Sequence, residues 1–303
     1  MLVATGAWAQ DPLAVLTEIQ VKNGKVEVRS SAQEAWQTPK PLLSLRAGAQ
    51  VRVIGEGRAV LVFTGGRGTQ LVTRANSPFT VVAAAGPNAS DRARAVLSHV
   101  TSFLLGHQRE KTYQSLSVRS VRAQPPVILA PRETRVLPGA LAFDWAGSER
   151  LTYQIRLLGP GGAVVWEQAD ARRPLAYPAD APRLEAGTRY TWELSTRQHG
   201  VQQATFEVIS AGDASRVSDA LGVLTPAGAG GYPPATLALM RAGLLFQETL
   251  YADARLELIA AIAAAPEEAT LHLLLGHVYD RTGLGLLAAS EFDEAEALAG
   301  PRP

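Results

Sequence analysis

The sequence predicts a multidomain β plus α protein with an all-β N-terminal module, a central β-sandwich and C-terminal α-helical hairpins. Glycine turns separate short strand-like segments over residues 18–82, and alternating apolar positions recur over residues 125–209. Near the C-terminus two stretches match each other at a constant offset, which places Ala242 opposite Gly276. The 303 residues are 47% hydrophobic and 19% charged, which is enough apolar side chain for a core in each of two or three domains.

Residues 1–17 are expected to hold a signal-peptide remnant followed by an N-terminal tail. Met1–Ala9 carries no charge and ends in Ala7-Trp8-Ala9 before Gln10, which has the small-x-small form of a secretory cleavage site. The basic start of a signal peptide is missing, so either the true start codon lies further upstream or these residues form an ordinary frayed terminus. We expect the former, and with it a periplasmic or otherwise exported protein. The absence of cysteine fits an exported chain without disulfides as well as a cytosolic one.

Residues 18–85 are predicted to form the first β domain. Val21, Val26 and Val28 indicate a hairpin around Asn23-Gly24, a dipeptide that favours the positive φ angles of tight turns. Further strands are predicted at residues 50–54, 58–63 and 70–73, divided by Gly55, Gly57 and the Gly65-Gly66 pair.

The motifs of this domain follow a recognisable order: Gly24-Lys25-Val26-Glu27-Val28, Trp36, Leu45-x-x-Gly48-x-x-Val51 and Gly57-Arg58-Ala59-x-Leu61. This order resembles the FecR-type extracytoplasmic domain, whose best-known members pass an iron-transport signal across the membrane to a sigma factor. Those regulators carry a cytoplasmic part and a membrane span ahead of the domain, whereas here the short tail that ends before Glu18 precedes it. The resemblance therefore implies an exported binding or assembly module, without the sigma-factor role.

Residues 86–124 are expected to form an amphipathic helix and a connector. Apolar side chains recur every three or four residues between Asn88 and Gln108, and Asn88 or Ser90 can cap the start of the helix. Two interpretations of the helix remain open. Its cations would suit a membrane surface, whereas helices of this length more often cover a sheet of their own protein, which is the role we expect. The cations are Arg92, Arg94, Arg109 and Lys111.

Residues 125–210 are predicted to form a β-sandwich of the immunoglobulin or fibronectin type III kind. Strand patterns lie at residues 141–145, 151–157, 163–166 and 204–209. The run Leu184-x-x-Gly187-Thr188-x-Tyr190 resembles the tyrosine corner of fibronectin type III domains, in which a buried tyrosine hydrogen-bonds to the loop that precedes its strand.

The aromatic residues of the sandwich allow two interpretations. Trp145 and Trp192 are in phase with neighbouring apolar residues, so we expect both in the core. A sugar-binding face built from Trp166, Tyr153 and Tyr177 is the alternative.

Residues 211–234 are expected to be a linker with a short helix near residues 215–223 and a hinge at residues 228–234, where glycine and proline are frequent. Residues 235–303 are expected to hold four helices, at about 235–247, 250–264, 268–281 and 285–298. Residues one repeat apart are alike in size, so small positions admit a neighbouring helix and large ones fill the remaining space. The matched pairs are Ala242 with Gly276, Leu245 with Tyr279, Ala254 with Ala288, Leu258 with Phe292, Ala261 with Ala295, and Pro266 with Gly300.

The repeat length, about 34 residues, is that of tetratricopeptide repeats. The second copy, Leu275-Gly276-x-x-Tyr279 followed by Ala288, Phe292 and Ala295, resembles that family's pattern, with His272 in place of its usual tryptophan. The resemblance implies a surface that binds other proteins through the inner helices, the first helix of each repeat, with these residues as candidates: Thr236, Leu239, Gln247, Thr270, His272 and Leu273. Because two repeats rarely stand alone, we expect the pair to pack against the sandwich or against a second copy in a homodimer.

Charge is unevenly distributed although the net charge is +1. Residues 1–124 carry 15 basic and 7 acidic side chains, residues 125–234 carry 10 and 11, and residues 235–303 carry 4 and 10. The basic N-terminal part could meet an anionic envelope surface or the acidic helices. Nucleic acid is not expected as a partner, because no aromatic-and-basic motif accompanies the cations. No window reaches the length of an apolar membrane span.

The motifs of catalysis are absent from the sequence. It has no Gly-x-Ser-x-Gly elbow, no phosphate-binding loop and no cysteine nucleophile, and its five histidines do not form a set with metal-ligand spacing. We therefore expect no enzyme activity, cofactor or metal. The preferred function is a noncatalytic exported adaptor or scaffold of the bacterial envelope that binds other proteins. Alternatives are a FecR-like periplasmic sensor or regulator of signalling, and a carbohydrate-binding envelope protein or enzyme.

Overall fold

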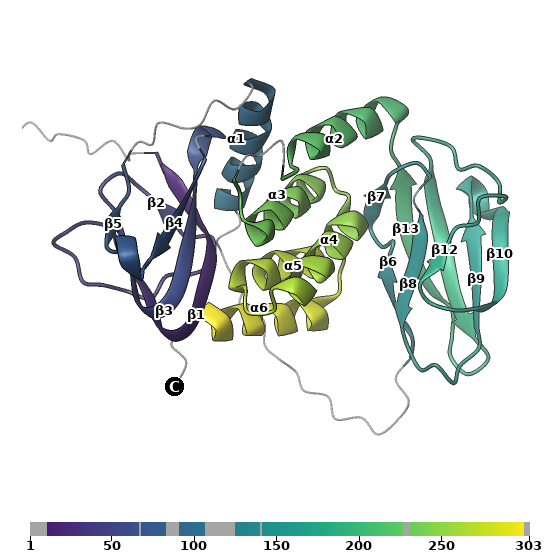
Figure 1. The fold of residues 1–303 in the computed structure, drawn as a ribbon. Coiled ribbons are helices and arrows are strands. Elements are labelled where there is room, and N and C mark those ends of the chain that lie inside the picture. The colour runs from purple at the N-terminus through teal and green to yellow at the C-terminus, as the bar shows by residue number, and fades with distance from the viewer. Residues whose placement is uncertain are drawn as a thin grey trace, which may run out of the picture.

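The computed structural model describes residues 11–66, 68–82, 91–106, 125–139, 141–226 and 231–299. β-sheets occupy much of the N-terminal two thirds of the chain, and helices dominate the C-terminal part, as the β plus α class predicts. Figure 1 shows the helices between two β-rich parts, one at each end of the molecule. The expected cleavage site at Ala9 and Gln10 lies outside the described residues.

The first β-rich part, here called the β module, spans residues 11–82. Its strands are β1 (Ala14–Arg29), β2 (Ser44–Leu45), β3 (Gln50–Phe63), β4 (Thr69–Thr73) and β5 (Phe79–Thr80), with short 3-10 turns η1 (Thr64–Gly66) and η2 (Arg74–Asn76). The sheet has the order β2-β1-β3-β4, and β5 pairs with β3. β1 begins at Ala14, and residues 14–17 are at most 1% exposed, so they belong to the sheet rather than to the expected tail.

The predicted hairpin at Asn23-Gly24 is wrong. β1 continues through both residues, and Gly24 pairs with Gly55 of β3. A Cβ atom on Gly24 would lie 1.8 Å from the carbonyl oxygen of Ile54, so glycine serves the close approach of two strands here and not a turn. For the same reason Gly55 and Gly57 do not divide two strands, and β3 is continuous.

Both faces of the paired strands are buried where the start of β1, residues 14–19, lies beside the end of β3, residues 59–63. Leu16 and Leu61 lie in the core of the β module, whereas Val15 and Val62 belong to a second core that the sheet shares with the helices. The helices therefore cover the outer face of this sheet, which accounts for apolar runs where a half-exposed strand would alternate.

The second β-rich part is a sandwich of two facing sheets. Its elements are β6 (Val127–Ala130), β7 (Thr134–Val136), β8 (Ala142–Ala146), β9 (Tyr153–Leu158), η3 (Pro160–Gly162), β10 (Val164–Ala171), β11 (Leu175–Ala176), β12 (Arg189–Thr196) and β13 (Gln202–Val208). One sheet has the order β10-β9-β12-β13-β7 and the other β11-β8-β6. Trp145 and Trp192 are fully buried between them, as predicted. The hydroxyl of Tyr190 accepts a hydrogen bond from the Glu185 amide at 2.9 Å, which is the expected bond to the preceding loop.

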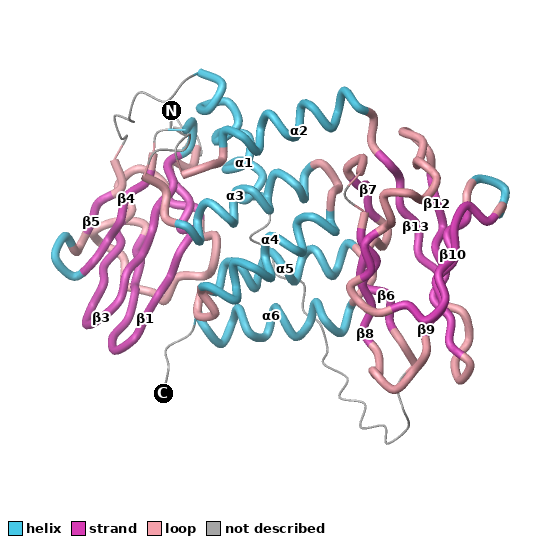
Figure 2. Tube along the Cα trace, turned by 45° about the vertical axis from the view of Figure 1, so that its right-hand side comes forward, coloured by secondary structure: helices cyan, strands magenta, loops and turns pink. Residues whose placement is uncertain are grey.

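The helices are α1 (Asp91–Gly106), α2 (Ala211–Val223), α3 (Pro234–Gln247), α4 (Tyr251–Ala264), α5 (Ala269–Arg281) and α6 (Gly285–Ala299). The ends of α3 to α6, the repeat helices, all fall within one residue of the prediction. The expected match of small and large side chains is present, because a Cβ atom on Gly276 would lie 2.6 Å from the ring of Phe292. Figure 2 shows the repeat helices as a stack that joins the β module to the sandwich.

Helix α1 packs on α3 and also contacts the β module at η1, so it covers part of its own protein as expected. A Cβ atom on Gly243 of α3 would lie 3.2 Å from Cγ1 of Val100, so glycine allows α1 to approach closely. The predicted caps Asn88 and Ser90, the cations Arg109 and Lys111, and residues 228–230 of the predicted hinge lie outside the described residues, as do the side chains of Arg92 and Arg94. Within the described ranges, no helix has both the length and the apolar character needed to cross a membrane.

Candidate functional site

The first junction joins β1 of the β module to the N-terminal ends of α3 and α5. The Oε1 atom of Glu18, in β1, accepts hydrogen bonds from the backbone amide of Thr236 at 2.9 Å and from its hydroxyl at 2.6 Å. Thr236 lies in the first turn of α3, where backbone amides lack partners within the helix and carboxylates are favoured. Glu18 therefore supplies from another module the cap that α3 does not make for itself.

Glu268 makes the reciprocal contact from the N-cap position of α5. Its Oε1 atom accepts a hydrogen bond from the backbone amide of Ile19 at 3.1 Å. The hydroxyl of Thr270, in the first turn of α5, donates to the carbonyl oxygen of Thr17 at 2.6 Å. The two-residue strand β2 pairs only with Ala14 and Val15 on this side of β1, so the start of α5 satisfies backbone groups of Thr17 and Ile19 that lie beyond it.

Burial sets the electrostatics of this junction. Glu18 and Glu268 are both fully buried, and Nη2 of Arg58 lies 3.2 Å from the second oxygen of Glu18. The second oxygen of Glu268 makes no hydrogen bond. Burial, together with the nearby carboxylate of Glu18, raises the pKa of Glu268 to about 8, so its carboxyl group is protonated at neutral pH. The junction then holds one carboxylate balanced by one guanidinium.

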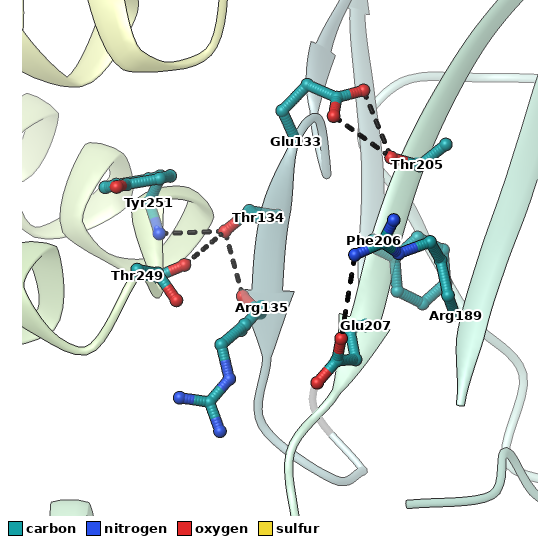
Figure 3. A pocket seen from close by; sticks show the side chains of 9 residues that line it. All are labelled: Glu133, Thr134, Arg135, Arg189, Thr205, Phe206, Glu207, Thr249 and Tyr251. Atoms are coloured by element: carbon teal, nitrogen blue, oxygen red, sulfur yellow. Dashed lines mark hydrogen bonds and ion pairs between the residues drawn. The ribbon is translucent and has the colours of Figure 1, made fainter. Parts of the chain in front are cut away.

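The second junction joins β7 of the sandwich to the loop between α3 and α4, and Figure 3 shows it from close by. The Thr134 hydroxyl accepts a hydrogen bond from the Tyr251 amide at 2.8 Å and donates to the Thr249 carbonyl oxygen at 3.0 Å. The Arg135 amide donates to the same carbonyl at 2.9 Å. Because the N-cap residue of α4, Leu250, has no side-chain acceptor, Thr134 of the sandwich caps this helix.

A hollow of about 310 Å³ lies at this second junction. Two of its charged side chains have partners in its wall: both carboxylate oxygens of Glu133 lie within 3.2 Å of the Thr205 hydroxyl, and Arg189 of β12 is 4.0 Å from Glu207 of the adjacent β13. Two residues of its wall, Glu133 and Thr249, have the left-handed φ angles of 44° and 58°. For a β-branched residue such as Thr249 this conformation is strained. The hollow is lined by Glu133, Thr134, Arg135, Arg189, Thr205, Phe206, Glu207, Thr249 and Tyr251.

A chain of ion pairs extends the second junction along α2. Asp213 lies 3.3 Å from both Arg135 of β7 and Arg216, and Arg216 also contacts Glu248 at 2.6 Å. Hydrogen bonds from Ser210 and Arg216 lower the pKa of Asp213. A separate pair, Arg255 of α4 with Asp144 of β8, is 2.9 Å long, and its guanidinium is almost buried. The repeat helices therefore pack against the sandwich, as expected.

The six residues proposed to contact a partner lie mostly inside the molecule. Thr236, Leu239, Thr270 and Leu273 are at most 1% exposed, and His272 is 8% exposed. Two of them, Thr236 and Thr270, belong to the first junction. His272 Nδ1 lies 2.7 Å from a carboxylate oxygen of Glu291, and this hydrogen bond raises the pKa of His272. Gln247 is half-buried, and its amide donates to the His99 carbonyl at 3.5 Å. These positions are not an open surface for another protein, because α3 and α5, the inner helices that carry them, face the chain's own modules.

The rings proposed for a sugar-binding face are also engaged. Trp166 stacks on Phe143 with ring centroids 5.8 Å apart and meets Tyr177 edge-on at 5.3 Å, while Tyr153 is buried. Trp36, one of the motif residues of the β module, contacts two cations. The guanidinium groups of Arg29 and Arg52 lie 4.4 Å and 4.2 Å from the centre of its ring.

Sequence reasoning missed the residues that make the junctions, Glu18, Glu268 and Thr134. One signal was present for Glu18, because a carboxylate within the apolar run of residues 14–19 needs a buried partner. Among the residues that the structure describes, no three histidine or acidic side chains gather as they would around a metal ion. Comparison with known protein families gives no match, and comparison with curated proteins gives no significant relative.

Proposed function

We propose that this chain is a noncatalytic exported adaptor of the bacterial envelope, which holds two components at a fixed separation. The observation that carries the proposal is the pair of polar junctions that bind the β module and the sandwich to opposite ends of the repeat helices (Figure 1). Hydrogen bonds that are buried at one end and partly buried at the other favour one relative orientation of the modules. A rigid spacer of this kind suits the assembly of two envelope components, because it keeps them at a fixed separation.

We further propose a family likeness for each part. The order of motifs favours a FecR-like β module, and the bond between Tyr190 and Glu185 supports a fibronectin type III-like sandwich. The repeat length and the contact of Gly276 with Phe292 support tetratricopeptide-like repeats. Since the inner faces of the repeats are used within the chain, partners are expected on the two outer modules.

The basic patch of the β module is the partner surface we favour. It consists of Lys25, Arg29, Trp36 and Arg52, with Glu27 in contact with Lys25 and Arg52. Three cations and one carboxylate leave the patch positive, and the Trp36 ring in contact with two guanidiniums gives it an apolar centre. An acidic protein surface or an anionic envelope polymer fits this chemistry.

Photo-crosslinking in living cells tests the adaptor proposal. A photoreactive residue at Trp36 probes the basic patch and one at Val201, which is 56% exposed, probes the sandwich, while Leu239, which is fully buried, is the control position. We expect discrete adducts from Trp36 and Val201 and none from Leu239. Absence of adducts from both outer modules would contradict the proposal, as would substrate turnover by the purified chain.

Fractionation tests export separately. The gene is expressed from its natural locus with a C-terminal epitope, and osmotic shock releases the periplasm. Release of the epitope with periplasmic markers is the expected result, and retention with cytoplasmic markers would overturn the proposed location.

A further inference from the structure

Helix α4 carries an exposed apolar ridge. The ridge consists of Leu256, Ile259, Ala260, Ala263 and Ala264, which follow one another at intervals of three and four residues on one side of the helix. Leu256 is 57% exposed and Ile259 is 38% exposed, and the three alanines are exposed as well. A continuous apolar side of this kind normally lies against another element.

The second repeat provides an internal comparison for this ridge. Three of the five matched positions on α6 are polar: Ser290, Asp293 and Glu294 correspond to Leu256, Ile259 and Ala260, whereas Ala297 and Leu298 correspond to Ala263 and Ala264. The three polar residues are exposed. Around Leu256, Ile259 and Ala260 this side is therefore apolar on α4, whereas the matched part of α6 is polar and exposed.

The charges beside the ridge are neutralised within the chain. On one side Glu257 pairs with Arg241, with Nε 2.7 Å from Oε1 and Nη2 3.4 Å from Oε2. On the other side Arg255 pairs with Asp144. A charged partner would find no free counter-charge at these borders, whereas two copies of this surface meet without repulsion of like charges.

We infer that the ridge is a contact between two copies of this chain, with the two α4 helices antiparallel about a two-fold axis near Ala260. The bulky side chains, Leu256 and Ile259, lie toward the N-terminal end of the ridge, and the small ones, Ala263 and Ala264, toward its C-terminal end. An antiparallel pair sets each Leu256 over the small side chains of its partner, so one surface complements itself, as a two-fold interface requires. A parallel pair would set large against large.

The size of the ridge limits the strength of this contact. A helix of 14 residues is about 21 Å long and offers less than the roughly 800 Å² per partner of a standard interface. We therefore expect a dimer with a dissociation constant on the order of micromolar.

Single-cysteine crosslinking of the full chain tests the inference, because the sequence has no cysteine of its own. Under mild oxidation Ala260→Cys is expected to form a disulfide-linked dimer, since Cα atoms that face each other across two closely packed helices come within disulfide range. Glu294→Cys, at the matched position of α6, is the control and is expected to stay monomeric. A mixture of Leu256→Cys and Ala264→Cys is expected to crosslink between the two variants, whereas Leu256→Cys alone is not.

Sedimentation equilibrium gives a second readout that does not depend on thiols. Ile259→Asp introduces the side chain that the second repeat carries at the matched position, and at an exposed site it leaves the far-ultraviolet circular dichroism unchanged. We expect it to weaken dimerisation at least about tenfold. A wild-type chain that stays monomeric at about 100 µM would overturn the inference. Equal crosslinking of Ala260→Cys and Glu294→Cys would overturn it as well, and crosslinking of Leu256→Cys with itself would refute the antiparallel arrangement.

Discussion

Replacing Glu268 by glutamine is expected to remove a pH dependence from the stability of the folded chain. Glutamine keeps the shape of the side chain and an oxygen that accepts the hydrogen bond from Ile19, so the first junction stays intact. What it removes is the ionisable proton. The groups that face Glu268 are the carboxylate of Glu18 and, through it, the guanidinium of Arg58, and the variant leaves both unchanged.

The direction in which stability changes with pH follows from the pKa of Glu268, which is about 8 in the folded chain and 4.5 ordinarily. A raised folded-state pKa means that the folded chain holds the proton more tightly than the unfolded chain does. Its contribution to stability is complete below about pH 4.5, falls as the pH rises and is lost above about pH 8. At about 1.4 kcal/mol per pH unit, the unfolding free energy of the wild type should fall relative to Glu268→Gln by at most about 4 kcal/mol between pH 5 and pH 8.

Urea denaturation followed by circular dichroism over this pH range measures the difference, and Glu296→Gln, an exposed carboxylate on α6, is the control. Hydrogen exchange of the Ile19 amide adds a local readout, because comparing wild type and variant at the same pH cancels the intrinsic pH dependence of exchange. If the stabilities of wild type and Glu268→Gln stay parallel from pH 5 to pH 8, the reasoning about this buried carboxyl group is refuted.

Three further substitutions test local parts of the structure by thermal unfolding. Thr249→Gly is expected to stabilise the chain by about 1 kcal/mol, because Thr249 has a φ of 58° and a buried hydroxyl without a partner; a lower melting temperature would contradict this. Thr134→Val keeps the shape but loses the cap of α4, at a cost of about 1 kcal/mol or more, and an unchanged melting temperature would speak against the second junction. Gly276→Ala forces a contact with Phe292 and should cost about 1–3 kcal/mol, whereas Gly285→Ala, which meets open space, should cost less than about 0.5 kcal/mol; equal losses would disprove the close packing.

The repeat helices could be predicted from sequence because their signal is local. The helical periodicity of apolar residues marks each helix, and the match of Gly276 with Phe292 lies within one helical hairpin. The turn predicted from the Asn23-Gly24 dipeptide is wrong because the contact that requires this glycine is not local. Its glycine is required by Gly55, a strand partner that the neighbouring residues do not reveal.

The junctions could not be predicted because they join segments far apart in the chain. The bond from Thr236 to Glu18 spans 218 positions, and the one from Tyr251 to Thr134 spans 117. No local pattern encodes which module meets which helix end. The inner helices were for this reason assigned to an external partner, although their polar side chains, such as Thr270, serve contacts within the molecule.

The central claim is that the two β-rich parts are held in one fixed arrangement by the repeat helices. Spin labels on two introduced cysteines, at Leu71 in β4 and at Val201 between β12 and β13, report their separation by double electron–electron resonance, because both sites are exposed and the chain has no other thiol. A single narrow distance distribution is predicted. A broad or multiple distribution would show modules that move independently and would contradict the account.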